Sequence, residues 1–209
     1  KVNLNTPSLS TFTGPQSFAI ASYTAPSWNG VPQKSSSETL DTLGDRIMTW
    51  LQYRNIGGTQ SLWVSRTVKV GTRTGIRWYE IRNMSATPSV YQQGTYAPDT
   101  KYRWMPSLAV DKFGNMAVGY SVSSSTMYPS IRYAGRLVGA PLGSLNQTER
   151  VIYNGTGSQL GGYNRSGDYS SMSVDPVDDC TFWYTTEYYQ ATGSNWQTRI
   201  ASFKFPACP

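Results

Sequence analysis

The stretch PSLAVDKFGNMAVGY, residues 106–120, returns as SSMSVDPVDDCTFWY at residues 170–184. Both copies run from a small residue through alternating apolar positions to an Asp, a turn and a second apolar run that ends in Tyr. In this frame Asp111 matches Asp175. A strand–turn–strand unit that occurs twice predicts a fold built from repeated sheets.

Further strands extend each copy. A third strand follows each hairpin, at residues 130–137 (SIRYAGRL) and 196–205 (WQTRIASFKF), and a more divergent copy of the unit lies at residues 45–83. Each unit therefore has three or four short antiparallel strands and repeats at roughly 55–68 residues, as propeller blades do. A two-sheet sandwich has similar strand lengths, but it does not predict the same Asp-turn hairpin at blade spacing.

We therefore predict an all-β fold of β-propeller-type blades, with no helix longer than about two turns. Residues 1–209 would form a single partial β-propeller domain, with approximate blades at 17–83, 84–145 and 146–209. An N-terminal strand, SFAIASYT (17–24), would contribute to the first blade. Three to four blades leave apolar faces open, so we expect the remaining blades to come from the same precursor or from another chain.

The repeated Asp has a structural explanation. A carboxylate at the end of a strand can accept backbone N–H groups across a tight turn. We expect hairpins at about 111–116 and 175–180. Gly114 and Asn115 would supply the positive-φ residues of the first turn, and Asp178 and Asp179 would do the same less ideally in the second.

Composition excludes several classes of function. The chain has 18 Lys and Arg against 12 Asp and Glu, a net charge of +6, and no long basic run, so we expect no nucleic-acid partner. No apolar stretch approaches the roughly 18 residues of a membrane span. The absence of His removes Ser-His-Asp chemistry and His-containing zinc sites, and no nucleotide-binding fingerprint is present. We expect no cofactor and no metal, since the spacing of Asp175, Asp178 and Asp179 is not that of a calcium loop.

The chain has two cysteines, Cys180 and Cys208. Two adjacent strands of one sheet could bring them together. In the loop-entropy model, a disulfide between them would stabilise the fold by about 3 kcal/mol, because it closes a loop of the unfolded chain. A disulfide is consistent with an oxidising, extracellular location. Buried free thiols are the alternative.

Three long words resemble a known group of proteins: residues 90–143 (VYQQGTYAPDTKYRWMPSLAVDKFGNMAVGYSVSSSTMYPSIRYAGRLVGAPLG), 167–189 (GDYSSMSVDPVDDCTFWYTTEYY) and 198–208 (TRIASFKFPAC). They resemble the C-terminal half of large secreted bacterial β-propeller proteins of unassigned function, over about residues 40–208. The resemblance implies a propeller fold, secretion and blades that precede this segment, but no reaction. The hairpins are also loosely similar to the Asp-box turns of sialidases, although the Ser-x-Asp-x-Gly-x-Thr-Trp pattern is not met.

Candidate binding residues come from two sets. Arg77, Arg132 and Arg199 occupy one equivalent position in three successive units and could bind a carboxylate or sulfate together; packing within each unit is the alternative. Aromatic residues in or beside turns could stack on sugars or contact a protein. These are Tyr91, Tyr96, Tyr102, Trp104, Tyr128, Tyr163, Tyr169, Tyr188 and Tyr189, of which Trp104, Tyr128 and Tyr188 are the preferred candidates.

These patterns favour a secreted binding or structural module, such as an adhesin, an assembly subunit or a glycan-contacting surface. The alternative is a sialidase-like propeller glycoside hydrolase, for which Glu80 and Glu187 lie beside tyrosines. Adjacent Tyr and Glu residues on a strand point to opposite faces, which disfavours a Tyr–Glu pair. We therefore expect that the chain is not an enzyme and has no catalytic residues.

Overall fold

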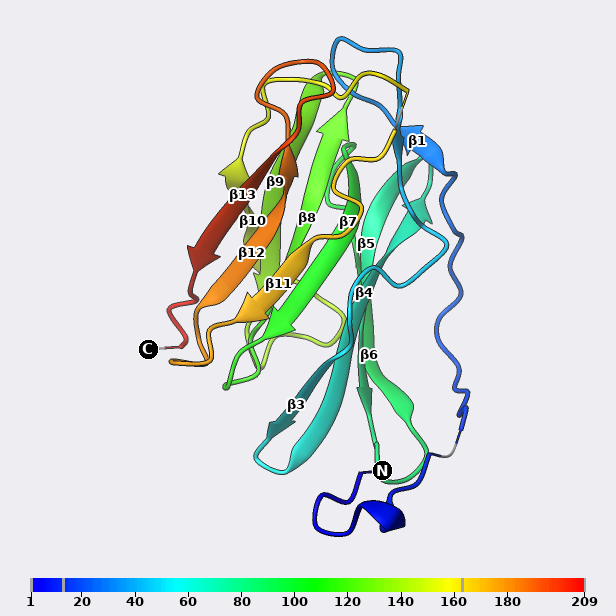
Figure 1. The fold of residues 1–209 in the computed structure, drawn as a ribbon, viewed down its shortest axis with the longest axis vertical. Coiled ribbons are helices and arrows are strands. Elements are labelled where there is room, and N and C mark those ends of the chain that lie inside the picture. The colour runs from blue at the N-terminus through cyan, green and yellow to red at the C-terminus, as the bar shows by residue number, and fades with distance from the viewer. Residues whose placement is uncertain (1, 13, 163, 209) are drawn as a thin grey trace.

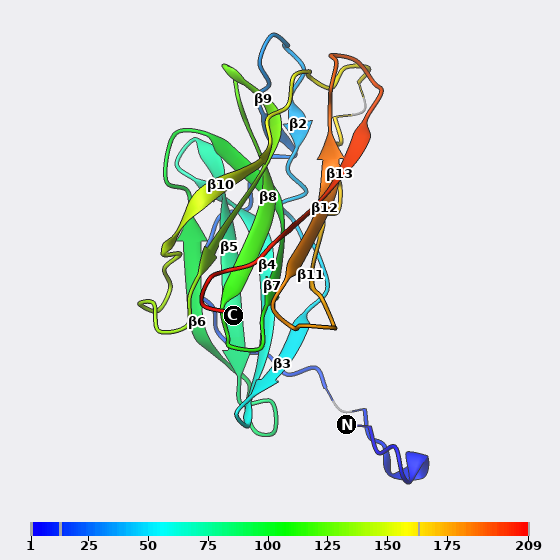
Figure 2. The ribbon, with the colours of Figure 1, turned by 90° about the vertical axis from the view of Figure 1, so that its left-hand side faces the viewer.

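A computed structural model describes residues 2–12, 14–162 and 164–208 and shows an all-β chain, as predicted. The described residues form thirteen strands and one short helical turn, η1 (Pro7–Leu9). Three antiparallel sheets carry the fold, and they lie one beside the next (Figure 1). The segment around η1 lies beyond the sheets, at the end near β3 (Figure 2).

The first sheet contains β3 (Gln52–Ile56), β4 (Thr59–Val70), β5 (Arg73–Arg82) and β6 (Ser89–Tyr96). The second sheet contains β7 (Tyr102–Val110), β8 (Met116–Ser124), β9 (Met127–Arg136) and β10 (Gln147–Tyr153). The third sheet contains β11 (Ser171–Val174), β12 (Phe182–Tyr188) and β13 (Gln197–Phe203). A small pair, β1 (Asn29–Val31) and β2 (Leu40–Asp41), completes the strands.

Each of the three sheets is a meander in which hydrogen-bonded neighbours are consecutive in the chain. The sheets are displaced toward the C-terminus from the predicted units. The unit predicted at 84–145 would begin with β6 and end before β10, yet β6 pairs with β5 and β10 pairs with β9. The reason is that a strand after a short connection pairs most readily with the strand before it.

The strand predicted at residues 17–24 does not form. Thr24 alone makes a β-bridge, to Lys69 in β4, and the segment runs extended beside the first sheet (Figure 1). β3 pairs with β4 only as far as Trp63, which leaves the β4 edge at Lys69 open. The segment joins that edge through Thr24 and does not continue the ladder at residues 17–23. It lies instead against the outer face, where the ring of Tyr23 is 3.9 Å from the guanidinium carbon of Arg66.

The hairpin predicted at 111–116 is confirmed, since β7 ends at Val110 and β8 begins at Met116. Asp111 is fully buried and its carboxylate accepts the N–H groups of Phe113 and Asn115, each at 2.9 Å, and the Asn115 side-chain amide at 2.8 Å. The Asn115 side chain in turn accepts the N–H of Val138. The Asp therefore fixes the turn and ties it to the loop after β9.

The second hairpin turn occupies residues 175–181, between β11 and β12. Here Asp178 accepts the N–H groups of Cys180 and Thr181, and Asp179 takes the positive φ of 52° that the turn requires. The two repeated turns touch, because Lys112 donates its backbone N–H to the Asp179 carbonyl at 2.9 Å. Asp179 supplies the positive φ expected of this pair, whereas Asp178 contributes its carboxylate instead. The repeated Asp175 accepts the Val177 N–H at 2.9 Å, as expected.

Both faces of the second sheet are buried. Alternation along β7 and β8 sends Val110 and Val118 into a core with Trp63 and Trp78 of the first sheet. It sends Ala109 and Ala117 into a second core with Met172, Phe182 and Tyr184 of the third sheet, and both cores lie between adjacent sheets. The Tyr184 ring lies so close to Gly119 that a Cβ there would be 2.5 Å from it, which explains the glycine in the middle of β8.

The predicted disulfide joins Cys180 and Cys208, with Cα atoms 5.7 Å apart. Both cysteines are fully buried. The bridge holds the chain that follows β13 against the turn that precedes β12, so the C-terminal end of the third sheet is closed covalently.

The repeat provides a matched pair of turn variants. Asp111→Ala is expected to lower the free energy of unfolding by about 2–4 kcal/mol, because three donors around a buried carboxylate lose their acceptor. Asp175→Ala is expected to cost about 1 kcal/mol, because its acceptor oxygens serve only the Val177 N–H and the exposed Trp183 indole. Urea unfolding of both variants measures the difference, and an equal or larger loss for Asp175→Ala would contradict this account of the turn.

Candidate functional site

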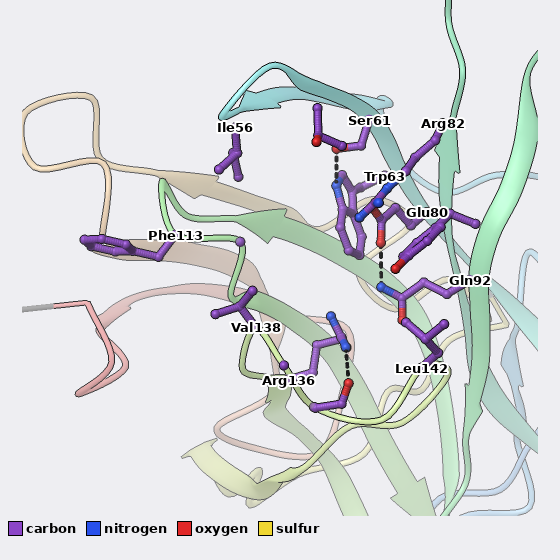
Figure 3. Close-up of a pocket in the computed structure, with 15 residues that line it drawn as sticks. Ile56, Ser61, Trp63, Glu80, Arg82, Gln92, Phe113, Arg136, Val138 and Leu142 are labelled. Atoms are coloured by element: carbon purple, nitrogen blue, oxygen red, sulfur yellow. Dashed lines mark hydrogen bonds and ion pairs between the residues drawn. The ribbon is translucent and has the colours of Figure 1, made fainter.

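A cleft of about 280 Å³ lies between the first and second sheets (Figure 3). Its walls come from β4, β5, β6 and the β3–β4 turn on one side. On the other side are the 111–116 turn, the end of β9 and the loop that follows it. The cleft therefore opens where the tips of two neighbouring sheets separate.

The floor on the first-sheet side is polar. Glu80 of β5 is 1% exposed and shares a face with Trp78, because alternate residues of a strand point the same way. One of its oxygens accepts the Nε–H of Arg82 and the other accepts the side-chain amide of Gln92. The carboxylate is thus held in place by two donors from neighbouring positions of the same sheet.

Arg136 enters from the second-sheet side and points into the hollow opposite Glu80 (Figure 3). Arg136 is 4% exposed, and its Nη2 donates a hydrogen bond to the Ala140 carbonyl at 2.9 Å. The guanidinium also lies 5.8 Å from the Trp78 ring. Burial lowers the pKa of Arg136 from its ordinary value.

The rim is apolar and exposed. Tyr91 (45% exposed) lines the cleft from the first sheet, Phe113 (44%) lines its far end from the 111–116 turn, and Val138 and Leu142 continue the rim along the loop after β9. The guanidinium of Arg82 lies 3.4 Å from the centre of the Tyr91 ring. Exposed rings around a polar floor suit a ligand that has both an apolar face and hydrogen-bonding edges.

Glu80 is the single acid among the described residues that line the cleft. Glu149 lies elsewhere, bonded to buried Arg103 at 2.7 Å and to the Tyr120 hydroxyl at 2.8 Å. Glu187 lies on β12 of the third sheet, where burial raises the pKa of its carboxyl group. The two glutamates of the predicted hydrolase alternative therefore do not share this cleft.

The three repeat-equivalent arginines do not converge in the cleft. Arg77 donates to Thr95 on the neighbouring strand, and Arg132 donates to the Tyr153 carbonyl at 3.0 Å. Arg199 lies 5.9 Å from the Tyr153 ring, so only it and Arg132 share a neighbour. Each contacts residues within its own or an adjacent sheet, as the packing alternative expects.

The preferred aromatic candidates also occupy separate places. Trp104 is fully buried in a core with Val31, Leu40 and Met48, so its selection as a binding residue was wrong. Trp104 is enclosed because the β1–β2 pair covers that end of β7. Its place beside a turn in the sequence did not indicate this cover.

Tyr128 lies beneath the Lys34 ammonium at 5.0 Å, and Tyr188 packs on Tyr153 at 4.2 Å between ring centres. Both are half-buried and lie outside the cleft. Tyr163 lies outside the described residues. Of the turn aromatics, Tyr91 is the one that lines the cleft.

Gln92, Phe113 and Arg136 line the cleft and were not identified from the sequence. Phe113 lies inside the repeated turn, where the second copy has Val177, so an aromatic residue in place of an aliphatic one was the available signal. Gln92 and Arg136 carry no such signal, because nothing in their residue type or position distinguishes them from other polar residues on strands.

No known family model matches this chain, and comparisons with curated proteins and with solved structures find no similar protein. The resemblance to secreted bacterial propeller proteins remains a prediction. Among the described residues no helix is long and apolar enough to span a membrane. The same residues contain no group of three or more His, Cys, Asp or Glu side chains arranged to hold a metal ion.

The repeat-equivalent arginines can be tested as packing residues. Arg132→Ala removes hydrogen bonds to the Tyr153 carbonyl and the Asn154 side chain and is expected to lower Tm by about 4–8 °C. Arg199→Ala, at an exposed position of β13, is expected to shift Tm by less than about 2 °C. Thermal unfolding by circular dichroism measures both, and equal shifts would show that the equivalent position has one shared role.

Proposed function

We propose that the protein is a secreted binding module that contacts glycans through the cleft between its first and second sheets. The observation that carries the proposal is the combination of exposed Tyr91 and Phe113 on the rim with Glu80, Gln92 and Arg136 on the floor. Aromatic rings stack on the apolar faces of sugars, and fixed polar groups bind their hydroxyls. A volume of about 280 Å³ suits a small ligand or one end of a longer chain.

Binding is favoured over glycoside hydrolysis by the acid content of the cleft. Hydrolysis with two carboxylates needs them about 5–5.5 Å apart for retention or about 6.5–9.5 Å apart for inversion. The described lining supplies Glu80 alone, and both its oxygens are already engaged by Arg82 and Gln92. These contacts suit a fixed recognition group better than a proton donor.

The proposal includes a propeller architecture, in which the three meander sheets are consecutive blades. The burial of both faces of the second sheet supports it, because a blade is covered by a neighbour on each side. The third sheet has three strands where the first and second have four, so β13 carries no fourth strand. Further blades from the same precursor or from another chain would cover this sheet.

Secretion is supported by the disulfide between Cys180 and Cys208, since such bridges persist in oxidising compartments. Low charge content and abundant aromatics also suit an extracellular contact surface. The ligand and the assembly can be tested separately.

A glycan array tests the ligand class. We expect the wild-type chain to bind a subset of glycans, and Tyr91→Ala to weaken that binding about tenfold or more, because an exposed stacking surface is lost. Tyr128→Ala is the matched control, since that tyrosine lies outside the cleft. Binding that is unchanged in Tyr91→Ala, or glycoside turnover that is abolished by Glu80→Gln, would overturn the proposal.

Light scattering tests the assembly. The outer face of the third sheet exposes Trp183 (42%) and Ile200 (66%), and we expect the 23.2 kDa chain to self-associate or to capture a blade-containing fragment. The double variant Trp183→Ser, Ile200→Lys is expected to reduce that association. A wild-type chain that stays monomeric at all concentrations, with no bound fragment, would contradict the predicted completion of the ring.

A further inference from the structure

The charges around the cleft do not balance. Its described lining contains two guanidinium groups, Arg82 and Arg136, and one carboxylate, Glu80, which leaves one positive charge in excess. Glu80 pairs with Arg82 through the Nε–H, so the Arg82 charge has a direct partner. Within the described part of the chain Arg136 forms no ion pair, and Glu80, whose oxygens are taken by Arg82 and Gln92, attracts it only across the cleft.

A guanidinium without a direct ion pair at 4% exposure is costly, because a buried charge loses much of its hydration. The Ala140 carbonyl takes one of the Arg136 donors, and the Nε–H is buried without a protein acceptor. The lowered pKa of Arg136 has the same origin, namely burial. A guanidinium stays protonated in proteins, so the group remains a cation that faces the hollow.

Arg82 is placed to act with Arg136. Its side chain is 31% exposed, and its planar group lies on the Tyr91 ring, which orients it at the rim. Two guanidiniums on opposite walls, one fixed by stacking and one by burial, form a site that favours an anion between them. Arginine binds carboxylate and sulfate groups with paired hydrogen bonds, which neutral hydroxyls do not match.

We infer that the cleft binds saccharides through an anionic substituent, a carboxylate or a sulfate, which is held between Arg136 and Arg82 while a sugar ring stacks at the rim on Tyr91 or Phe113. This inference rests on the proposed function and names the chemical class of its ligand. The net charge of +6 acts in the same direction, since a cationic protein attracts acidic polysaccharides at long range.

The test uses probes that differ in charge and little else. Oligomers of glucuronate and galacturonate are titrated against the intact chain beside their methyl esters, with inorganic sulfate as a third probe, and affinity is read by calorimetry or NMR. We expect at least one acid oligomer to bind tenfold or more tightly than its ester. That preference is expected to weaken as salt is raised, as an ion contact requires.

Arg136→Met keeps an unbranched side chain against Trp78 and removes the charge. We expect this variant to bind acid and ester with about equal affinity and to leave the affinity for the ester unchanged. Arg136→Lys keeps the charge but not the paired donors and is expected to give an intermediate preference. Because Arg136 is buried, each variant is checked for a native urea midpoint, and Arg82→Gln at the more exposed position provides a second route to the same loss of preference.

The outcomes separate this inference from the function on which it rests. Equal affinity for acid and ester, with both lost in Tyr91→Ala, would overturn the anion site and leave glycan binding intact. Sulfate binding that requires Arg136, with no saccharide binding, would support the anion site and overturn the saccharide assignment. If none of the probes binds, the inference fails, and the array result then decides the proposed function by itself.

Discussion

The second sheet has two apolar faces, and the rest of the structure follows from the need to bury both of them. Val110 and Val118 point one way along β7 and β8, whereas Ala109 and Ala117 point the other way. A meander of four strands cannot cover itself, so the first and third sheets lie against it as neighbours, and small residues such as Gly119 mark where a ring from the next sheet approaches the backbone. The second and third sheets are joined at one end through the two repeated turns, because Lys112 donates its backbone N–H to the Asp179 carbonyl.

The same arrangement creates the cleft. Twisted sheets that pack face to face diverge toward their ends, and the 111–116 turn and the loop after β9 then face the β3–β4 hairpin across a gap. Glu80 shares the inward face of β5 with Trp78 and Ile76, and Arg136 shares that of β9 with Ala134, yet both lie where the packed layer ends. Their polarity is tolerated there because hydrogen bonds from Gln92 and to Ala140 satisfy part of it. The candidate site is therefore a boundary of the core rather than an addition to it.

Residues that repeat and residues that line the site are largely different sets. Asp111 and Asp175 recur because each carboxylate accepts the N–H two residues further on and so closes its turn. Arg132 recurs with Arg77 and Arg199, yet the three do not converge: Arg77 bonds Thr95, whereas Arg132 and Arg199 contact the backbone and the ring of Tyr153. The cleft instead depends on residues that the equivalent positions do not share, such as Phe113 where the second copy has Val177, and a sequence search guided by repetition passes over them.

The amino-acid sequence by itself determined the all-β class, the position of the 111–116 hairpin and the pairing of Cys180 with Cys208. These features depend on alternation, turn chemistry and the scarcity of cysteine, which are local or countable. Tertiary structure alone decided that Trp104 is core, that residues 17–24 lie beside a sheet without forming a strand of it, and that Glu80 and Arg136 face each other. Those outcomes depend on which face of each sheet is covered by a neighbouring sheet. Contacts between β5 and β9 join segments more than fifty residues apart in the chain, so no local sequence pattern predicts them.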